Sequence, residues 1–234
     1  AQPTIDAITE ARNNGVKIVL CTGRPLSGVQ PYLDKLAIKG ASEFAITFNG
    51  AMAQSLDGQV MVNHTISYDN FLETEMLSIY TTNRDTNPYG IAESFLVRLP
   101  IKFRSPEEIP RDLVMSKAMF VDYPENITKA NDLIPAKLRD EMYVVQTEPF
   151  FIEMMNKQAS KGKTLGELAD QLHLTKDNLM AIGDQGNDLT MVKAAGLGVA
   201  MGNAIDEVKD AAQFITKPNT EDGVAFAINK YINH

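Results

Sequence analysis

A short acidic, glycine-rich segment is the part of this sequence best suited to chemistry. The hexapeptide GDQGND at 183–188 follows the apolar run Leu179–Ile182 and precedes a helix-like stretch at 189–195. Carboxylates are the natural ligands of Mg²⁺, and glycines let the backbone pass close to a bound ion. In open α/β sheets, ligands bind at the carboxyl ends of strands, where Asp184 stands. The segment therefore predicts that Asp184 binds a divalent metal ion.

Asp188, at the end of the same hexapeptide, has two readings. Its carboxylate can cap the helix that follows. It can also orient the ligands of the metal without binding the metal itself, and the first role does not exclude the second. The Asp-x-Asp-x-Asp-Gly spacing of an EF-hand is absent, so the segment is not a calcium loop of that kind.

Two further segments carry groups that can bind phosphate. Thr22 and Gly23 follow an apolar strand predicted at 16–21, and a hydroxyl and an amide at a strand end can donate to phosphate oxygens. A threonine at that place can equally be structural. Lys161 begins a predicted helix, where its charge opposes the helix dipole. A bound anion would explain this lysine, and the alternative is a solvated lysine in a turn.

Several common sites are absent from the sequence. Residue 157 is a lysine, so Gly162-Lys163-Thr164 does not end a P-loop, and no Gly-x-Gly-x-x-Gly fingerprint occurs. The 3 histidines are scattered without the spacing of zinc ligands. Cys21 is the single cysteine, which excludes an intrachain disulfide and favours a reducing compartment.

The composition is that of a soluble globular protein. The chain has 234 residues, 44% of them hydrophobic and 22% charged, enough for one or two domains. Its net charge of −8 argues against binding to nucleic acid or to an anionic membrane. No apolar stretch is long enough to span a bilayer, and no signal peptide is visible. We therefore expect a cytoplasmic protein whose partner is a small molecule; the sequence does not indicate an oligomeric state.

The elements that position these residues alternate between helix and strand at both ends of the chain. This alternation predicts an α/β fold with a parallel sheet. In the first part we expect a helix at 3–14, a strand at 16–21, a helix at 27–36, a strand at 44–48 and a hairpin around 57–58. In the last part we expect helices at 161–172, 188–195, 205–212 and 223–232, and strands at 178–182, 198–200 and 214–215.

The middle of the chain has a different, α+β pattern. Strand-like runs occur at 94–97, 117–121 and 143–145, with helical pieces between 127 and 138. We therefore predict a core domain made of 1–65 and 156–234, interrupted by a smaller domain at 66–155. Near Glu75 and Met76 a helix-like segment becomes strand-like with no turn residues between. We expect that residues are missing there, as at the amino terminus, where the chain begins at Ala1.

Taken together, these segments resemble the haloacid dehalogenase-like phosphatases, in particular the Cof-type sugar-phosphatase branch. CTGRP with Thr22, SKGKTL with Lys161 and GDQGND at 183–188 are similar to the family's second, third and fourth motifs, in the same order. TFNGA at 47–51, GVAMGNA at 198–204 and EDGVA at 221–225 also resemble this branch. The resemblance implies a Rossmann-like core, with helices on both faces of a parallel sheet, and an inserted α+β cap domain of the C2 type.

The resemblance also implies a reaction. Phosphatases of this family hydrolyse small phosphorylated metabolites, sugar phosphates in this branch, with Mg²⁺ and through an aspartyl phosphate. Asp184 would bind Mg²⁺, and Asp188 would orient the groups around it. The phosphoryl oxygens would be bound by Thr22, the Gly23 amide, Lys161 and Asn187. The entrance to the site would be lined by Arg24 and Asn49.

The family's first motif is missing from this sequence. That motif, an Asp-x-Asp after an early strand, supplies the nucleophile and the acid–base group, and no Asp-x-Asp occurs in the 234 residues. Loss of its strand should leave a gap in the middle of the sheet and expose strand edges. We expect the segment to exist in the natural protein. One alternative is a non-catalytic sensor of phosphorylated metabolites on the same scaffold, and another is a phosphomutase or phosphonatase-like enzyme.

Overall fold

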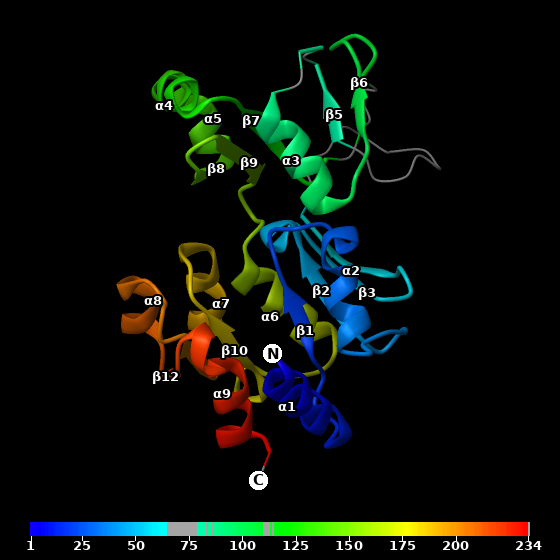
Figure 1. The fold of residues 1–234 in the computed structure, drawn as a ribbon, viewed down its shortest axis with the longest axis vertical. Helices are drawn as coiled ribbons and strands as arrows, with labels where there is room; N and C mark the ends of the chain where they lie inside the picture. Colours follow the sequence, from blue (N-terminus) through cyan, green and yellow to red (C-terminus); the bar gives the residue numbers. More distant parts are fainter. Residues whose placement is uncertain (65–78, 83, 86, 110–112, 114, 234) are drawn as a thin grey trace. The chain divides into compact units, whose positions relative to one another are not determined.

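The chain forms two compact units. The computed structural model describes residues 1–64, 79–82, 84–85, 87–109, 113 and 115–233 (Figure 1). The first unit consists of Ala1–Gly23, Gln30–Asn63 and Ser160–His234, and the second of Arg24–Val29 and His64–Ala159. The junction near Glu75 and Met76, where we expected missing residues, lies outside the described residues.

These units differ from the sequence-based division at Arg24–Val29 and by a few residues at each boundary of the insertion. Arg24–Val29, which the sequence assigned to the core, groups with the second unit. The hydroxyl of Ser27 donates a hydrogen bond to the carbonyl of Val97 at 2.7 Å. Gly28 also packs closely against Val97. These long-range contacts could not be read from the local pattern.

In the first unit, helices and strands alternate as predicted, within a few residues at each end. The elements before the second unit are α1 (Gln2–Asn13), β1 (Val19–Cys21), α2 (Leu26–Lys35), β2 (Phe44–Thr47), β3 (Met52–Ser55) and β4 (Val60–Asn63). Those after it are α6 (Lys161–Gln171), β10 (Met180–Gly183), α7 (Leu189–Ala194), β11 (Leu197–Ala200), α8 (Asp206–Ala211), β12 (Phe214–Ile215) and α9 (Gly223–Tyr231). Only α2 crosses from one unit to the other.

The strands of the first unit form two separate sheets. One has the order β1-β2-β3-β4, with β1 and β2 parallel and the rest antiparallel. The other has the order β10-β11-β12 and is parallel throughout. Helix α6 packs on β2, β3 and β4, whereas α7 packs on β10 and β11. Helices α1 and α9, the first and last of the described helices, lie side by side (Figure 1).

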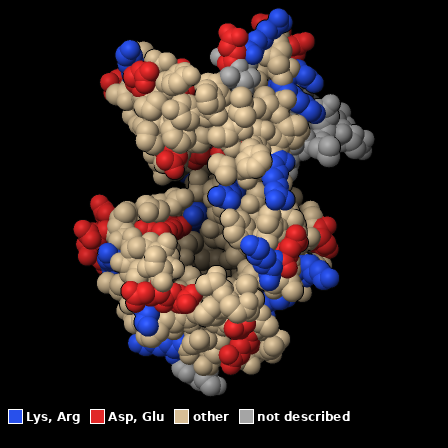
Figure 2. Space-filling view, in the orientation of Figure 1, with Lys and Arg blue, Asp and Glu red and all other residues tan. Residues whose placement is uncertain are grey.

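Strands β1 and β10 are both edge strands among the strands that the structure describes. Each pairs with a neighbour on one side only. The surface of the first unit is hollowed between the parts that carry them (Figure 2). The apolar side chains of Leu20, Met180 and Ile182 on these strands are partly exposed. The gap expected in the middle of the sheet is therefore confirmed.

Two apolar clusters of the first unit pack its sheets against helices. The one beneath α6 is built around Phe44 and Ile46 of β2 and Leu168 of the helix. The one beside β11 is built around Val192 of α7 and Val208 of α8. Burial of such side chains contributes about 1.5–3 kcal/mol each. Each cluster holds one of the two sheets against its helix.

The second unit has an α+β arrangement. Its elements are β5 (Ile79–Thr81), α3 (Pro88–Val97), β6 (Ile101–Phe103), β7 (Ala118–Val121), α4 (Pro124–Leu133), α5 (Ala136–Glu141), β8 (Met142–Glu148) and β9 (Phe151–Asn156). Strands β7, β9 and β8 form an antiparallel sheet, and β5 pairs with β6 in parallel. Ile127, Ile134 and Ile152 form the apolar contact between this sheet and its helices.

One predicted strand of the second unit is a helix. The run at 94–97 is rich in apolar residues and reads as a strand, yet it forms the last turn of α3. The side chain of Asn87 accepts a hydrogen bond from the Gly90 amide at 2.9 Å, and Pro88 occupies the first turn. An asparagine cap followed by proline is a strong helix start, and this start outweighs the strand preference of the run.

We predict opposite effects for two glycines of helix α6. A Cβ at Gly162 would lie 2.2 Å from the carbonyl oxygen of Thr190, so Gly162→Ala should push α6 away from α7 and lower the free energy of unfolding by about 1–3 kcal/mol. Nothing lies within 4 Å of a Cβ at Gly166, so Gly166→Ala should raise the free energy of unfolding by about 0.5–1 kcal/mol. Urea unfolding measures both, and equal effects would contradict this packing.

Candidate active site

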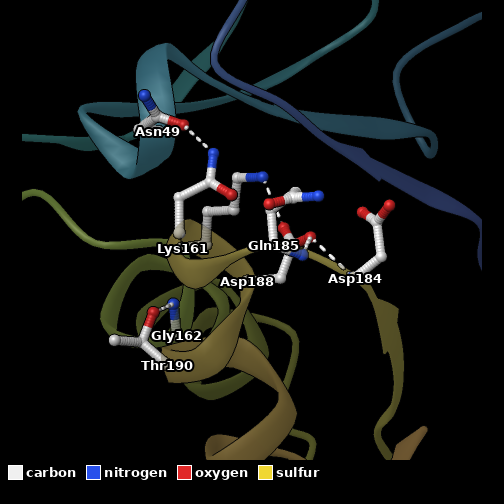
Figure 3. A network of polar contacts seen from close by, with 8 residues as sticks. Asn49, Lys161, Gly162, Asp184, Gln185, Asp188 and Thr190 are labelled. Atoms are coloured by element: carbon white, nitrogen blue, oxygen red, sulfur yellow. Dashed lines mark hydrogen bonds and ion pairs between the residues drawn. The ribbon is translucent and has the colours of Figure 1, made fainter. Parts of the chain in front are cut away.

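The candidate site lies at the carboxyl end of β10. Asp184 directly follows this strand, and the side-chain amide of Asn203 donates to its carboxylate at 3.1 Å. Asn203 comes from the segment after β11, which the parallel pairing of Gly183 with Ala200 brings alongside. In Figure 3 the Asp184 carboxylate and the Lys161 side chain extend to the same side of the turn. The sequence analysis did not assign Asn203 a role, although it lies in the GVAMGNA tract.

A buried ion pair forms the floor of the site. The Lys161 ammonium lies 2.6 Å from the Asp188 carboxylate, and the two side chains are only 6% and 9% exposed. The second carboxylate oxygen of Asp188 accepts hydrogen bonds from the amides of Asp184 at 3.0 Å and Gln185 at 3.1 Å (Figure 3). The reading of Lys161 as a solvated turn residue is therefore wrong.

Asp188 determines the shape of the acidic turn. It ends the 3-10 helix η3 (Gly186–Asp188), and its carboxylate accepts from the amide of Gln185 at the start of that turn. It makes no side-chain capping bond to α7, so the predicted cap of the following helix is wrong. The carboxylate thus accepts from three donors, which occupy three of its about four lone-pair sites and suit an orienting role. A Cβ at Gly183 would lie 2.4 Å from the Asp188 Cβ, so only glycine lets the strand pass this side chain.

The electrostatics of the site favour a cation beside Asp184. Burial raises the pKa of Asp184, and the nearby negative charge of Asp188 raises it further. The Asn203 hydrogen bond and the Lys161 charge act in the opposite direction and do not cancel the increase. Two carboxylates thus share one lysine, and a divalent ion would remove the remaining negative charge.

The residues present fit Mg²⁺ as one side of its ligand shell. Asp184 offers a hard carboxylate oxygen of the kind that Mg²⁺ prefers. Within the described part of the chain, no group of three or more histidine, cysteine, aspartate or glutamate side chains could hold a metal ion. Further ligands would therefore have to come from substrate, water or another segment, which is usual for Mg²⁺.

Thr22 and Gly23 lie where β1 ends. The Thr22 amide donates to the Ile46 carbonyl at 2.8 Å, which continues the pairing of β1 with β2. Its neighbour Cys21 packs against the apolar cluster under β10. Burial raises the pKa of the Cys21 thiol to about 12, with smaller effects from the charges of Lys161 and Asp188. The end of β1 is thus within electrostatic range of the buried ion pair.

Asn187 is tied to a loop from the other sheet. Its side-chain amide donates to the side-chain oxygen of Asn49 at 2.9 Å. Asn49, which we expected to line the entrance of the site with Arg24, is only 7% exposed and is hydrogen-bonded to Asn187. Arg24 belongs to the second unit, so the entrance role assigned to it stays a prediction. Thr22, Lys161, Asn187 and Asp184 all belong to the first unit and come together through these contacts.

Comparison with known proteins decides the family. Residues 1–228 match the family model of the haloacid dehalogenase-like hydrolases. The chain belongs to this family. Its α/β fold, a Rossmann-like core with an inserted cap, is the family's fold, and the resemblance seen in the motifs is confirmed.

Individual relatives agree with this assignment. YxeH of Bacillus subtilis, provisionally named a phosphatase, is 41% identical over 242 residues, covering 97% of this chain and 90% of the relative. YcsE of the same organism, named a 5-amino-6-(5-phospho-D-ribitylamino)uracil phosphatase, is 32% identical and covers 97% of this chain and 86% of the relative. The solved structure of a haloacid dehalogenase-like hydrolase from Bacteroides thetaiotaomicron has a TM-score of 0.84 and 27% identity, covering 98% of this chain and 92% of that one.

The protein is accordingly an enzyme of the phosphoric monoester hydrolase class. The match to YxeH is longer than this whole chain of 234 residues, so that relative carries extra residues inside the matched span. Among the described residues, every helix is too short or too polar to cross a membrane.

We predict that the two lysines at the start of α6 differ greatly in their effect on stability. Lys161→Met should leave the buried Asp188 charge without its ammonium partner and lower the free energy of unfolding by about 3–5 kcal/mol. Lys163→Met is the matched control, because Lys163 forms an exposed pair with Glu167 at 4.0 Å and its replacement should cost less than about 0.5 kcal/mol. Urea unfolding of both variants tests this, and a cost below about 1 kcal/mol for Lys161→Met would contradict the paired arrangement.

We predict that Asp184→Asn stabilises the metal-free protein and removes its response to Mg²⁺. Because the pKa of Asp184 is raised in the folded protein, its charged form at pH 7 opposes folding, and this opposition appears as pH rises through the folded pKa. The neutral variant should therefore melt slightly higher than the parent without metal. With about 10 mM MgCl₂, the melting temperature of the parent should rise above its metal-free value, and that of the variant should not change.

The control is Asp170→Asn, which changes an exposed acid in α6. It should keep the melting response of the parent to Mg²⁺. A response to Mg²⁺ that survives in Asp184→Asn would show that the ion binds elsewhere.

Proposed function

We propose that this protein is a Mg²⁺-dependent phosphatase of small phosphorylated metabolites, with sugar phosphates as the first class to test. The observation that carries the proposal is the buried Lys161–Asp188 pair next to the Asp184 carboxylate at the end of β10. A fixed ammonium and a carboxylate with a raised pKa, side by side, suit a phosphoryl group together with a divalent ion.

The residues of this chain would bind and orient the phosphoryl group. Lys161 would donate to its oxygens while Asp188 holds the ammonium in place. The Thr22 hydroxyl, the Gly23 amide and the Asn187 side-chain amide would supply further donors. In other enzymes, removal of one such preorganised donor lowers the rate about 10²–10³-fold. Asp184 would hold Mg²⁺, which when bound neutralises charge on the phosphoryl oxygens.

The nucleophile must come from elsewhere than these two aspartates. Asp188 has its carboxylate engaged by three donors, and Asp184 is assigned to the metal ion. We propose that a further strand pairs with both β1 and β10 and carries the nucleophile and the acid–base aspartates. The two facing edges and the recess between them support this (Figure 2). A parallel strand there would end at the same sheet edge as β10 and place its carboxylates beside Asp184.

With such a strand, the reaction divides into two displacements. The carboxylate would attack phosphorus and form an aspartyl phosphate, while the second aspartate gives a proton to the leaving alcohol. The same group would then take a proton from water, which attacks phosphorus and releases phosphate. The donors of this chain hold the phosphoryl oxygens in both steps.

The substrate class and the location are part of the proposal. The name of YcsE describes a small phosphorylated substrate for that relative, which supports the same class here. The net charge of −8 is unfavourable for nucleic acid and for anionic membranes as partners. A single cysteine and these properties suit the cytoplasm.

We predict Mg²⁺-dependent release of phosphate from p-nitrophenyl phosphate by the natural full-length protein. Asp184→Ala should lower kcat/KM by at least about 10³-fold with an unchanged far-UV spectrum, because the metal ligand is lost and the fold is not. Asp170→Ala serves as the control and should keep the rate of the parent.

Two outcomes would argue against this proposal, and a separate measurement tests for the missing motif. An active protein whose rate ignores both EDTA and Asp184→Ala would contradict the metal role. Phosphate binding without any turnover would favour the sensor alternative. An intact mass and the codons before Ala1 would show whether the natural protein has an Asp-x-Asp after an apolar strand.

A further inference from the structure

The 3-10 helix η1 (Phe48–Gly50), which follows β2, touches each of the segments that carry proposed phosphate ligands. The Asn49 amide donates to the Thr22 carbonyl at 2.9 Å, and the Asn49 side-chain oxygen accepts from Asn187 at 2.9 Å. The Thr164 hydroxyl of α6 donates to the Gly50 carbonyl at 2.5 Å. This loop, the η1 loop, therefore joins the ends of β1 and β10 to the start of α6.

The η1 loop also packs against these segments without spare room. A Cβ at Gly50 would lie 2.3 Å from the carbonyl of Ser160, directly before Lys161. A Cβ at Gly23 would lie 3.0 Å from the side-chain oxygen of Asn49. The Asn49 amide thus fills the space that a side chain at position 23 would need. Contacts this close transmit a displacement of Asn49 to its neighbours.

The backbone of the η1 loop is held in an unfavourable conformation. Phe48, Asn49 and Gly50 have φ values of 52°, 56° and 95°, in the left-handed region. For L-residues other than glycine this costs roughly 1–2 kcal/mol each, although asparagine tolerates it better than most. Such strain persists only where the surroundings hold it, and it concentrates at functional sites. Phe48 and Asn49 are each only 7% exposed, so packing holds the strained turn.

We propose that Asn49 is a positioning residue of the phosphoryl site and acts through Asn187. This inference rests on the proposed function, because it assumes that Asn187 donates to a phosphoryl oxygen. A carboxamide can turn over and exchange its donor for its acceptor. The Asn49 side-chain oxygen can only accept, so it keeps the NH₂ group of Asn187 on its side and fixes that side chain. The donor is then oriented before substrate arrives, which is what electrostatic preorganisation requires.

The test is a double-mutant cycle in the natural full-length protein. Asn49→Gly removes the side-chain amide and introduces a residue that readily adopts the φ near 56° observed there. Asn187→Ala removes the proposed donor. We would measure the Kd of inorganic phosphate with Mg²⁺ by calorimetry, together with kcat and KM for p-nitrophenyl phosphate, in both single variants and the double variant.

Positioning predicts strong coupling between the two changes. Asn49→Gly should weaken phosphate binding about 10-fold in the parent and less than about 2-fold when Asn187 is already alanine. The melting temperature should fall equally in both backgrounds, since loss of packing does not depend on Asn187. Equal, independent losses of phosphate affinity would overturn the inference and leave Asn49 as a packing residue.

A second variant keeps the inference testable if Asn49→Gly does not fold. Asn49→Asp preserves the shape and the acceptor, so Asn187→Ala should still weaken phosphate binding in that background about as much as in the parent. Loss of this effect would overturn the inference. A parent that binds no phosphate in the presence of Mg²⁺ overturns the proposed function as well, whereas a binding parent with additive variants overturns only the role of Asn49.

Discussion

The buried pair of Lys161 and Asp188 is the interaction on which the site depends. An ammonium and a carboxylate at 2.6 Å, both nearly without solvent, are stable only where the charges pair and the remaining carboxylate oxygen finds donors. Asp188 meets this demand by accepting two backbone amides of the acidic turn, and so the pair also fixes the path of the chain at Asp184. The start of α6 and the end of β10 are thereby held together. This arrangement fixes the position of Asp184, whose carboxylate is the proposed metal ligand.

Much of the first unit could be predicted because its local signals agree with one another. The apolar runs before Thr22 and Asp184 predict strands, and they form β1 and β10, although both lie at sheet edges and are only partly buried. Asp188 was expected to cap the helix after it, but its carboxylate bonds back to Gln185 within its own turn and leaves α7 without a side-chain cap. The prediction of a strand at 94–97 was wrong, because these residues favour a strand while Asn87 and Pro88 start a helix upstream. There the capping signal and the propensity disagreed, and the cap prevailed.

The contacts of the site that the sequence did not predict are those between distant segments. Asn49 and Asn187 are separated by 138 positions, and nothing in either local pattern indicates that they meet. The same holds for Asn203 beside Asp184 and for the burial of Lys161. Asn49-Gly50 after a strand did indicate a tight turn, but a turn signal does not say which residues the turn will face. Tertiary packing supplies that information.

The seam between β1 and β10 has a thermodynamic consequence. Among the described strands, no ladder of backbone hydrogen bonds crosses it, and there Cys21 packs against the small cluster around Ala181 and Met191. Attraction between apolar groups weakens on cooling, whereas a ladder of amides and carbonyls is much less sensitive to temperature. A chain of these residues alone should therefore loosen first in the cold along this seam, while each half keeps its own paired strands; the further strand proposed above would supply the missing ladder.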